Sequence, residues 1–265
     1  MTRFARLSAV VTLVCASLWL ASSDGILQAQ SASTPQQPQL LMINEIQLKP
    51  ETAPDWTELQ KSMLETQKKV ATRGREVWAS GPGGDPYLRA IVTPIASIAQ
   101  FDNPNPFAKV LGEQAFAEFS AKNRKLVAGS HSTIVITRPD LGFGARPATT
   151  PKLAILSIVN AANGRGPELE AFLKTDVVPA LKKGGVTYYS VVQVVFGDDV
   201  NKYMTLTLVN DFAEIAKGSP LERALGREGM LKLTQKSGPL VTRLERRIIR
   251  YLPDLSFGPS APTSN

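Results

Sequence analysis

The chain has 265 residues, of which 43% are hydrophobic and 20% charged, an ordinary composition for a soluble globular protein. Its formal net charge is +7, and its single cysteine, Cys15, lies in the first apolar segment. Beyond that segment the composition excludes disulfide bonds, thiolate metal sites and a cysteine nucleophile.

Residues 1–29 have the pattern of a signal peptide. A short basic start precedes an apolar run from Leu7 to Ala21, which is too short to span a bilayer. Small residues follow, so we expect cleavage near residues 21–23 or after Ala29, with an uncleaved anchor as the alternative. The sequence therefore predicts a periplasmic or secreted protein without membrane contact after cleavage. Because an exported chain rarely meets nucleic acid, its positive charge is interpreted as a property of its surface.

The next part of the chain predicts a strand–helix–strand–strand–helix–strand unit at residues 40–144. A polar spacer at 30–39, expected to be disordered, precedes it. An Asp55-x-x-Glu58 capping box favours a helix, and the Gly- and Pro-rich run at 81–86 favours a turn. The expected elements are a strand at 40–48, a helix from 55 to about 73, strands at 76–80 and 87–99, a helix at 107–127 and a strand at 132–138.

A linker at residues 145–150 leads into a second unit of the same order at 151–258. Pro179 is expected to kink or shorten the first helix of this unit. A polar tail at 259–265 completes the chain. The expected elements are a strand at 153–159, a helix at 168–183, strands at 187–196 and 203–209, a helix from 220 and a strand at 244–251.

The two units also share sequence. A shift of 114 positions places Pro106 on Pro220, and 12 of the 39 positions that follow without a gap are identical. The match ends in Pro-Asp-Leu-x-Phe-Gly at 139–144 and again at 253–258. We interpret this as a tandem duplication. We expect the repeated hexapeptide to have a structural role, with its Asp in a turn and its Leu and Phe packed on the sheet.

A β-α-β-β-α-β order is that of a ferredoxin-like unit, whose sheet has one uncovered face. Two fused units resemble the dimeric α/β-barrel superfamily, which includes antibiotic-biosynthesis monooxygenases, NIPSNAP-like proteins and stress-responsive barrel proteins. The resemblance rests on topology, unit length and duplication. It implies an α+β fold in which two tandem units pack sheet to sheet as a pseudo-symmetric α/β barrel within one chain.

Strand alternation predicts which side chains face the space between the sheets. Asn44 or Glu45 and Ser157 are expected to face it from the first strand of each unit. Trp78, Tyr188 and Tyr189 are further lining candidates, although strand aromatics more often belong to the core. The candidate ligand-binding residues are Tyr87, Arg89, His131, Tyr203, Thr205, Glu245, Arg247 and Tyr251.

His131 and Tyr203 are the candidate catalytic residues. His131 is the only histidine, so a histidine-based metal site is not predicted, and a solvated surface position is the simpler interpretation. Some members of the superfamily bind haem through a histidine, but nothing around His131 supports that role, and no cofactor is predicted. An inward-facing Arg247 requires either a carboxylate such as Glu45 or Glu245, or an anionic ligand.

Three functions remain open from the sequence. The first is binding of a small organic ligand, either anionic or neutral, between the sheets. The second, implied by the resemblance, is a cofactor-independent monooxygenase or isomerase. The third is a non-catalytic envelope interaction module whose barrel is filled by side chains. Either a monomer or a homodimer is compatible with the sequence.

Overall fold

The computed structural model describes residues 37–71 and 73–258. The expected signal peptide, residues 30–36 of the spacer and the expected tail lie outside this range. Within it, none of the helices combines the length and the hydropathy that crossing a membrane requires.

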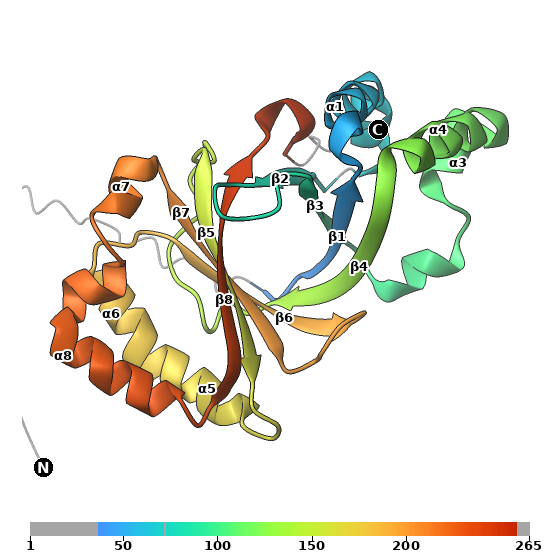
Figure 1. Cartoon of the computed structure of the whole chain (residues 1–265). Helices are drawn as coiled ribbons and strands as arrows, with labels where there is room; N and C mark the ends of the chain where they lie inside the picture. The colour runs from blue at the N-terminus through green and yellow to red at the C-terminus, as the bar shows by residue number, and fades with distance from the viewer. Residues whose placement is uncertain (1–36, 72, 259–265) are drawn as a thin grey trace, which may run out of the picture. The chain divides into compact units, whose positions relative to one another are not determined.

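The first half of the described chain contains four strands and the helices between them (Figure 1). Its elements are β1 (Leu40–Leu48), η1 (Pro50–Thr52), α1 (Ala53–Ser62), α2 (Leu64–Val70), β2 (Glu76–Ser80), β3 (Leu88–Ile95), η2 (Ile98–Asp102), α3 (Pro106–Leu111), α4 (Glu113–Leu126) and β4 (Val127–Thr137).

The second half follows the same alternation. Its elements are β5 (Leu153–Ala161), α5 (Gly166–Phe172), the π-helical turn η3 (Leu173–Val177), α6 (Val178–Lys183), β6 (Tyr189–Phe196), β7 (Lys202–Val209), α7 (Phe212–Ala216), α8 (Pro220–Ser237), β8 (Val241–Tyr251) and η4 (Pro253–Leu255).

The eight strands form one closed antiparallel barrel in the order β1-β3-β2-β8-β5-β7-β6-β4. The predicted α+β class and the barrel are thus confirmed. Within each half the strands follow one order, β4-β1-β3-β2 and β8-β5-β7-β6. The halves join twice, through β2–β8 and through β6–β4.

The two junctions repeat each other residue by residue. Trp78 pairs with Tyr251 in one junction, and Val192 pairs with Thr137 in the other. Adding 114 to the number of Trp78 gives Val192, and subtracting 114 from that of Tyr251 gives Thr137. The bridges Arg75–Phe257 and Phe143–Tyr189 have the same relation. Each half therefore places the Phe of its hexapeptide beside the start of the second strand of the other half.

The hexapeptides have the packing expected of a structural element. Leu141 and Leu255 are almost fully buried, each in a different apolar cluster. Asp140 does more than cap a turn, because its carboxylate also pairs with Arg138 and Lys174.

Several predicted element boundaries were wrong; for example, the strand expected at 87–99 ends at Ile95. The helix expected at 107–127 is interrupted at Gly112, whose φ of 83° lies in the region that glycine tolerates best. Gly226 interrupts α8 at the position 114 residues later, with φ 64°. In addition, β4 begins at Val127 instead of 132, since it follows α4 without a loop.

The helices lie outside the barrel. Figure 1 shows α5, α6 and α8 on one side and α1, α3 and α4 on the other. In the second half, Leu169, Leu173 and Leu181 pack against Tyr189 and Tyr203 of the sheet. In the first half, Trp56 packs with Leu48 and Val77. A third apolar cluster, around Trp78, Ala154 and Ile249, occupies part of the space inside the barrel.

Candidate functional site

The barrel encloses a cavity of about 730 Å³ that is lined by residues from all eight strands. Alternate residues face it: odd-numbered positions on β1 and β8, and even-numbered positions on β3, β5 and β6. Its middle is apolar. Side chains of this apolar belt include Leu41, Ile43, Trp78, Val92, Ile158 and Met204.

The structure confirms part of the predicted inward face. Glu45, Glu245 and Arg247 line the cavity, as do Trp78 and Tyr188. Thr205 also borders the cavity, but it alternates with the lining residues Met204 and Leu206 and pairs with Val191 of the outer cluster. Tyr251 shares the inward side of β8 and packs on the Trp78 ring, with the ring centroids 5.1 Å apart, in the cluster inside the barrel.

The inward orientation was wrong for Tyr87, Arg89, Ser157 and Tyr203. On β3, β5 and β7 the lining comes from even-numbered neighbours such as Leu88, Ala90, Leu156, Met204 and Leu206. Tyr87 packs in the outer cluster around Trp56, and Tyr203 packs under α5. The register also places Arg89, not Tyr87, at the position equivalent to Tyr203. Both faces of these strands are covered, so polarity does not distinguish the two orientations.

Arg89 illustrates the cost of this outward position. Its Nη1 donates to the Pro86 and Leu88 carbonyl oxygens at 2.7 and 3.0 Å, while its buried Nε has no acceptor among the described residues. Burial lowers the pKa of Arg89, an effect that Asp85 partly opposes.

One end of the cavity is rich in charge. We call it the His131 end. Arg247 donates to Glu245 at 2.5 Å and to Glu45 at 3.1 Å, so its partners are carboxylates. Burial lowers the pKa of Arg247, but its bonds to Glu245 and Glu45 outweigh this effect and raise it. The same contact lowers the pKa of Glu245. Other charged lining residues at this end are Asp198, Lys202 and Arg243.

His131 lies at the rim of this end. His131 pairs across the strands with Glu45, which faces inward. The His131 side chain, however, is 53% exposed and does not line the cavity. Its Nε2 is 4.0 Å from Asp198 Oδ2. Lys202 also contacts Asp198, and this hydrogen bond lowers the pKa of Asp198. Nothing in the spacing of the sequence indicated that Asp198 would lie beside His131.

The opposite end, which we call the Arg146 end, combines the loop before β2 with the linker between the halves. Arg146 Nη2 is 2.9 Å from Glu76 Oε1. Arg73, Arg75 and Tyr188 also line this end. Sequence reasoning missed these residues, because a linker and a loop carry no strand alternation from which an inward direction could be read.

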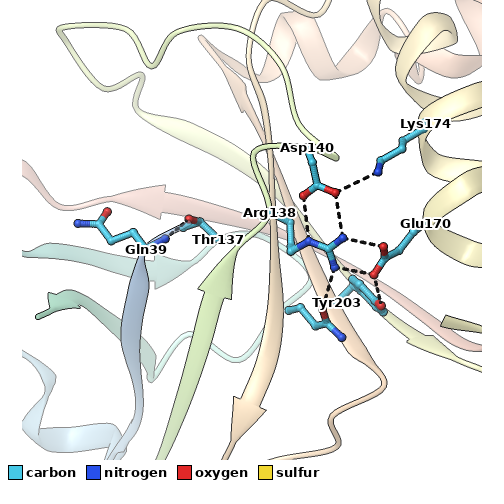
Figure 2. Close-up of polar contacts among 8 residues, drawn as sticks. Gln39, Thr137, Arg138, Asp140, Glu170, Lys174 and Tyr203 are labelled. Carbon is cyan, nitrogen blue, oxygen red and sulfur yellow. Dashed lines mark hydrogen bonds and ion pairs between the residues drawn. The ribbon is translucent and has the colours of Figure 1, made fainter. Parts of the chain in front are cut away.

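Tyr203, the second catalytic candidate, belongs to a polar network on the outside of the barrel (Figure 2). Its hydroxyl donates to Glu170 Oε1 at 2.9 Å. Arg138 donates to both oxygens of Glu170, at 2.5 and 2.6 Å, to both oxygens of Asp140, at 2.9 Å each, and to Gln193. The network thus connects the end of the first half to α5, β6 and β7 of the second.

The pKa shifts in this network are those of residues that stabilise the fold. Hydrogen bonds from Arg138 lower the pKa of Asp140, to about 2, and lower that of Glu170. The hydrogen bonds that Arg138 donates to Glu170 and Asp140 raise its own pKa. Burial, followed by the nearby Glu170, raises the pKa of Tyr203 to about 12. A phenol so hard to ionise, outside the cavity, does not suit proton transfer near neutral pH.

The charged residues of the site do not form a metal site. Among residues 37–71 and 73–258, no three His, Cys, Asp or Glu side chains gather as metal ligands would. At both ends of the cavity, each acidic lining residue already has a basic partner.

The fold resembles that of many solved structures, including these two. One is described as a putative monooxygenase from Fusobacterium nucleatum: it is 14% identical, with a TM-score of 0.57, and the match covers 81% of this chain and 92% of that one. The other is described as a putative monooxygenase from Lactobacillus acidophilus: it is 9% identical, with a TM-score of 0.53, and the match covers 87% and 100%. At these identities the likeness shows the fold alone. No family model matches the chain, and no curated protein does.

Proposed function

We propose that the barrel binds a small, largely apolar organic molecule between its two sheets. The observation that carries this proposal is the cavity of about 730 Å³, which has an apolar middle and charged ends. Ligand sites in proteins typically have volumes of about 300–1,000 Å³ and mostly apolar walls with a few polar groups. A barrel that acted only through its surface would be expected to be filled by side chains, so the cavity favours binding over an interaction module.

The experiment uses N-phenyl-1-naphthylamine, a neutral dye that fluoresces in apolar surroundings. We expect wild-type protein to bind the dye with saturation. Ala90 lines the cavity, so Ala90→Phe should fill it and weaken binding at least about tenfold. Thr93→Phe, on the same strand but outside the lining, is the matched control. Equal dye binding by both variants would show that the dye sits elsewhere.

An enzyme of the monooxygenase type is the second candidate. The observation that favours it is His131 beside Asp198 at one end of the cavity, together with the names of the two similar structures. The ion-paired carboxylates argue against it, since a lowered pKa makes a weak general base. Oxygen uptake with a panel of phenols and quinols, present in wild type and lost in His131→Ala, would favour the enzyme.

We further propose that the halves are two ferredoxin-like units, residues 40–144 and 151–258, derived by tandem duplication. The repeated strand order, the two junctions offset by 114 residues and the paired interruptions at Gly112 and Gly226 support this. Because each sheet covers the other, cleavage of the linker near Ala148 should leave the halves associated. Halves that separate and stay folded would contradict a shared barrel.

Export remains a proposal from the first 29 residues. Mass spectrometry of the protein from its native cells should find an N-terminus between about residues 22 and 32. An intact Met1 on cytoplasmic protein would contradict it.

A further inference from the structure

The two ends of the cavity differ in net charge. The side chains of Arg73 and Arg146 line the Arg146 end against one acid, Glu76. Arg75 also lies at this end, but its guanidinium points out of the barrel, toward Gln60 and Gln67 of α1 and α2. At the His131 end, three acids face three bases, and ion pairs connect them. Those residues are Glu45, Asp198, Glu245, Lys202, Arg243 and Arg247. The Arg146 end alone therefore has an excess of positive charge.

Arg75 adds a buried positive charge near this end of the cavity. The residue is only 5% exposed, and its guanidinium donates to the amide oxygens of Gln60, at 2.9 Å, and Gln67. It makes no ion pair within the described ranges 37–71 and 73–258. Burial lowers its pKa to about 10, so it remains charged at neutral pH. A desolvated cation without a carboxylate contributes a positive potential that solvent screens poorly.

The two other arginines are accessible to a ligand. The Arg146 and Glu76 side chains, which pair with each other, are 33% and 29% exposed. Arg73 is exposed and forms no ion pair in the described part of the chain. One carboxylate thus serves the two arginines that a ligand can reach, and an added anion would bring the end closer to neutrality.

The apolar belt begins directly below these groups. On β1, Leu41 and Ile43 line the cavity between Gln39 and Glu45, about 20 Å of strand. A molecule lying along the barrel therefore meets one cationic end, an apolar middle and one neutral end.

We propose that the ligand is an amphiphile with a single carboxylate, which lies at the Arg146 end while the apolar body occupies the middle of the barrel. This inference rests on the proposed binding function and adds to it the ligand class and its orientation. The recognising chemistry is that of a monoanion on an apolar body, whether aliphatic or aromatic.

The experiment compares decanoate with decan-1-ol, which differ in the charged group, by calorimetric titration at low salt. Wild type should bind decanoate more tightly. Arg73→Gln combined with Arg146→Gln should weaken decanoate about tenfold and leave decan-1-ol nearly unchanged. The matched control is Arg246→Gln combined with Arg250→Gln, which removes two charges from exposed positions of β8 outside the lining. It should change neither affinity.

The outcomes separate the two proposals. If decan-1-ol binds but decanoate binds no tighter, or if both double variants weaken decanoate equally, the carboxylate proposal is wrong and the binding proposal stands. If neither compound binds the wild-type protein, both are wrong. Added salt should reduce the preference for decanoate, because these arginines are partly exposed.

Discussion

Arg138→Met tests whether the network in Figure 2 fastens the two halves together. Arg138 is 19% exposed, and Glu170 is 22% exposed. Without the guanidinium, Glu170 keeps only the Tyr203 hydroxyl as a partner. Removing one partner of a fully buried pair costs about 3–5 kcal/mol, and this partial exposure reduces the cost to about 2 kcal/mol. Asp140 is 43% exposed and keeps Lys174 as a partner. Losing its contact with Arg138 therefore adds at most about 1 kcal/mol to the cost in stability.

We therefore expect Arg138→Met to lower the free energy of unfolding by about 2–3 kcal/mol at pH 7. Urea denaturation followed by circular dichroism measures this. The control is Arg246→Met, an exposed arginine without an ion pair in the described residues, which should stay within about 0.5 kcal/mol of wild type.

The pH dependence has a definite sign. Arg138 holds the pKa of Asp140 at about 2, below its ordinary 3.8, and that of Glu170 below 4.5. Stabilisation from a lowered carboxyl pKa is present above the unfolded-state value and disappears as the pH falls through the folded-state value. The difference between wild type and variant should thus shrink below about pH 4.5. A cost under about 0.5 kcal/mol at pH 7, or one that does not change with pH, would refute the reasoning.

Two further predictions concern the cavity and the repeat. Arg247→Met should lower stability by about 1–2 kcal/mol, less than for a fully buried pair, because Glu45 and Glu245 are 39% and 31% exposed; unchanged thermal melts would show that the pairs contribute nothing. Gly112→Ala and Gly226→Ala should each cost about 1–3 kcal/mol, since a built Cβ meets no atom at either site and the positive φ alone disfavours alanine. A neutral result at only one glycine, by urea denaturation, would show that the two interruptions are not equivalent.

The alternation of side chains along a strand predicted the inward face correctly on β8, where two charged residues share one side. Glu245 and Arg247 stand two residues apart on β8 and both line the cavity, as expected. On β7 the same reasoning failed. Tyr203 was expected to face inward, but the apolar side chains of Met204 and Leu206 line the cavity there. The polar end of Tyr203 is accommodated outside by Glu170, a partner that no local pattern reveals.

The Arg138 network shows what sequence reasoning cannot reach. Its members come from the segment directly after β4 and from α5, β6 and β7, so they meet only when the barrel closes. The sequence pointed to Asp140, as part of the repeated hexapeptide, and to Tyr203, as an inward-facing candidate, but not to their meeting. Asp254, the repeat partner of Asp140, has no such network, because Leu252 stands 114 residues after Arg138. The repeat predicted the common backbone, and the differences between its copies determine where the polar contacts lie.

The most direct test of the cavity as a binding site is a crystal structure with 10-bromodecan-1-ol, measured for anomalous scattering from bromine. This compound is neutral, so its binding does not depend on the preference for a carboxylate. We predict a bromine peak inside the barrel, along the apolar belt that includes Trp78 and Met204. Bromine peaks found only on the outer surface, with none between the sheets, would contradict the proposed function.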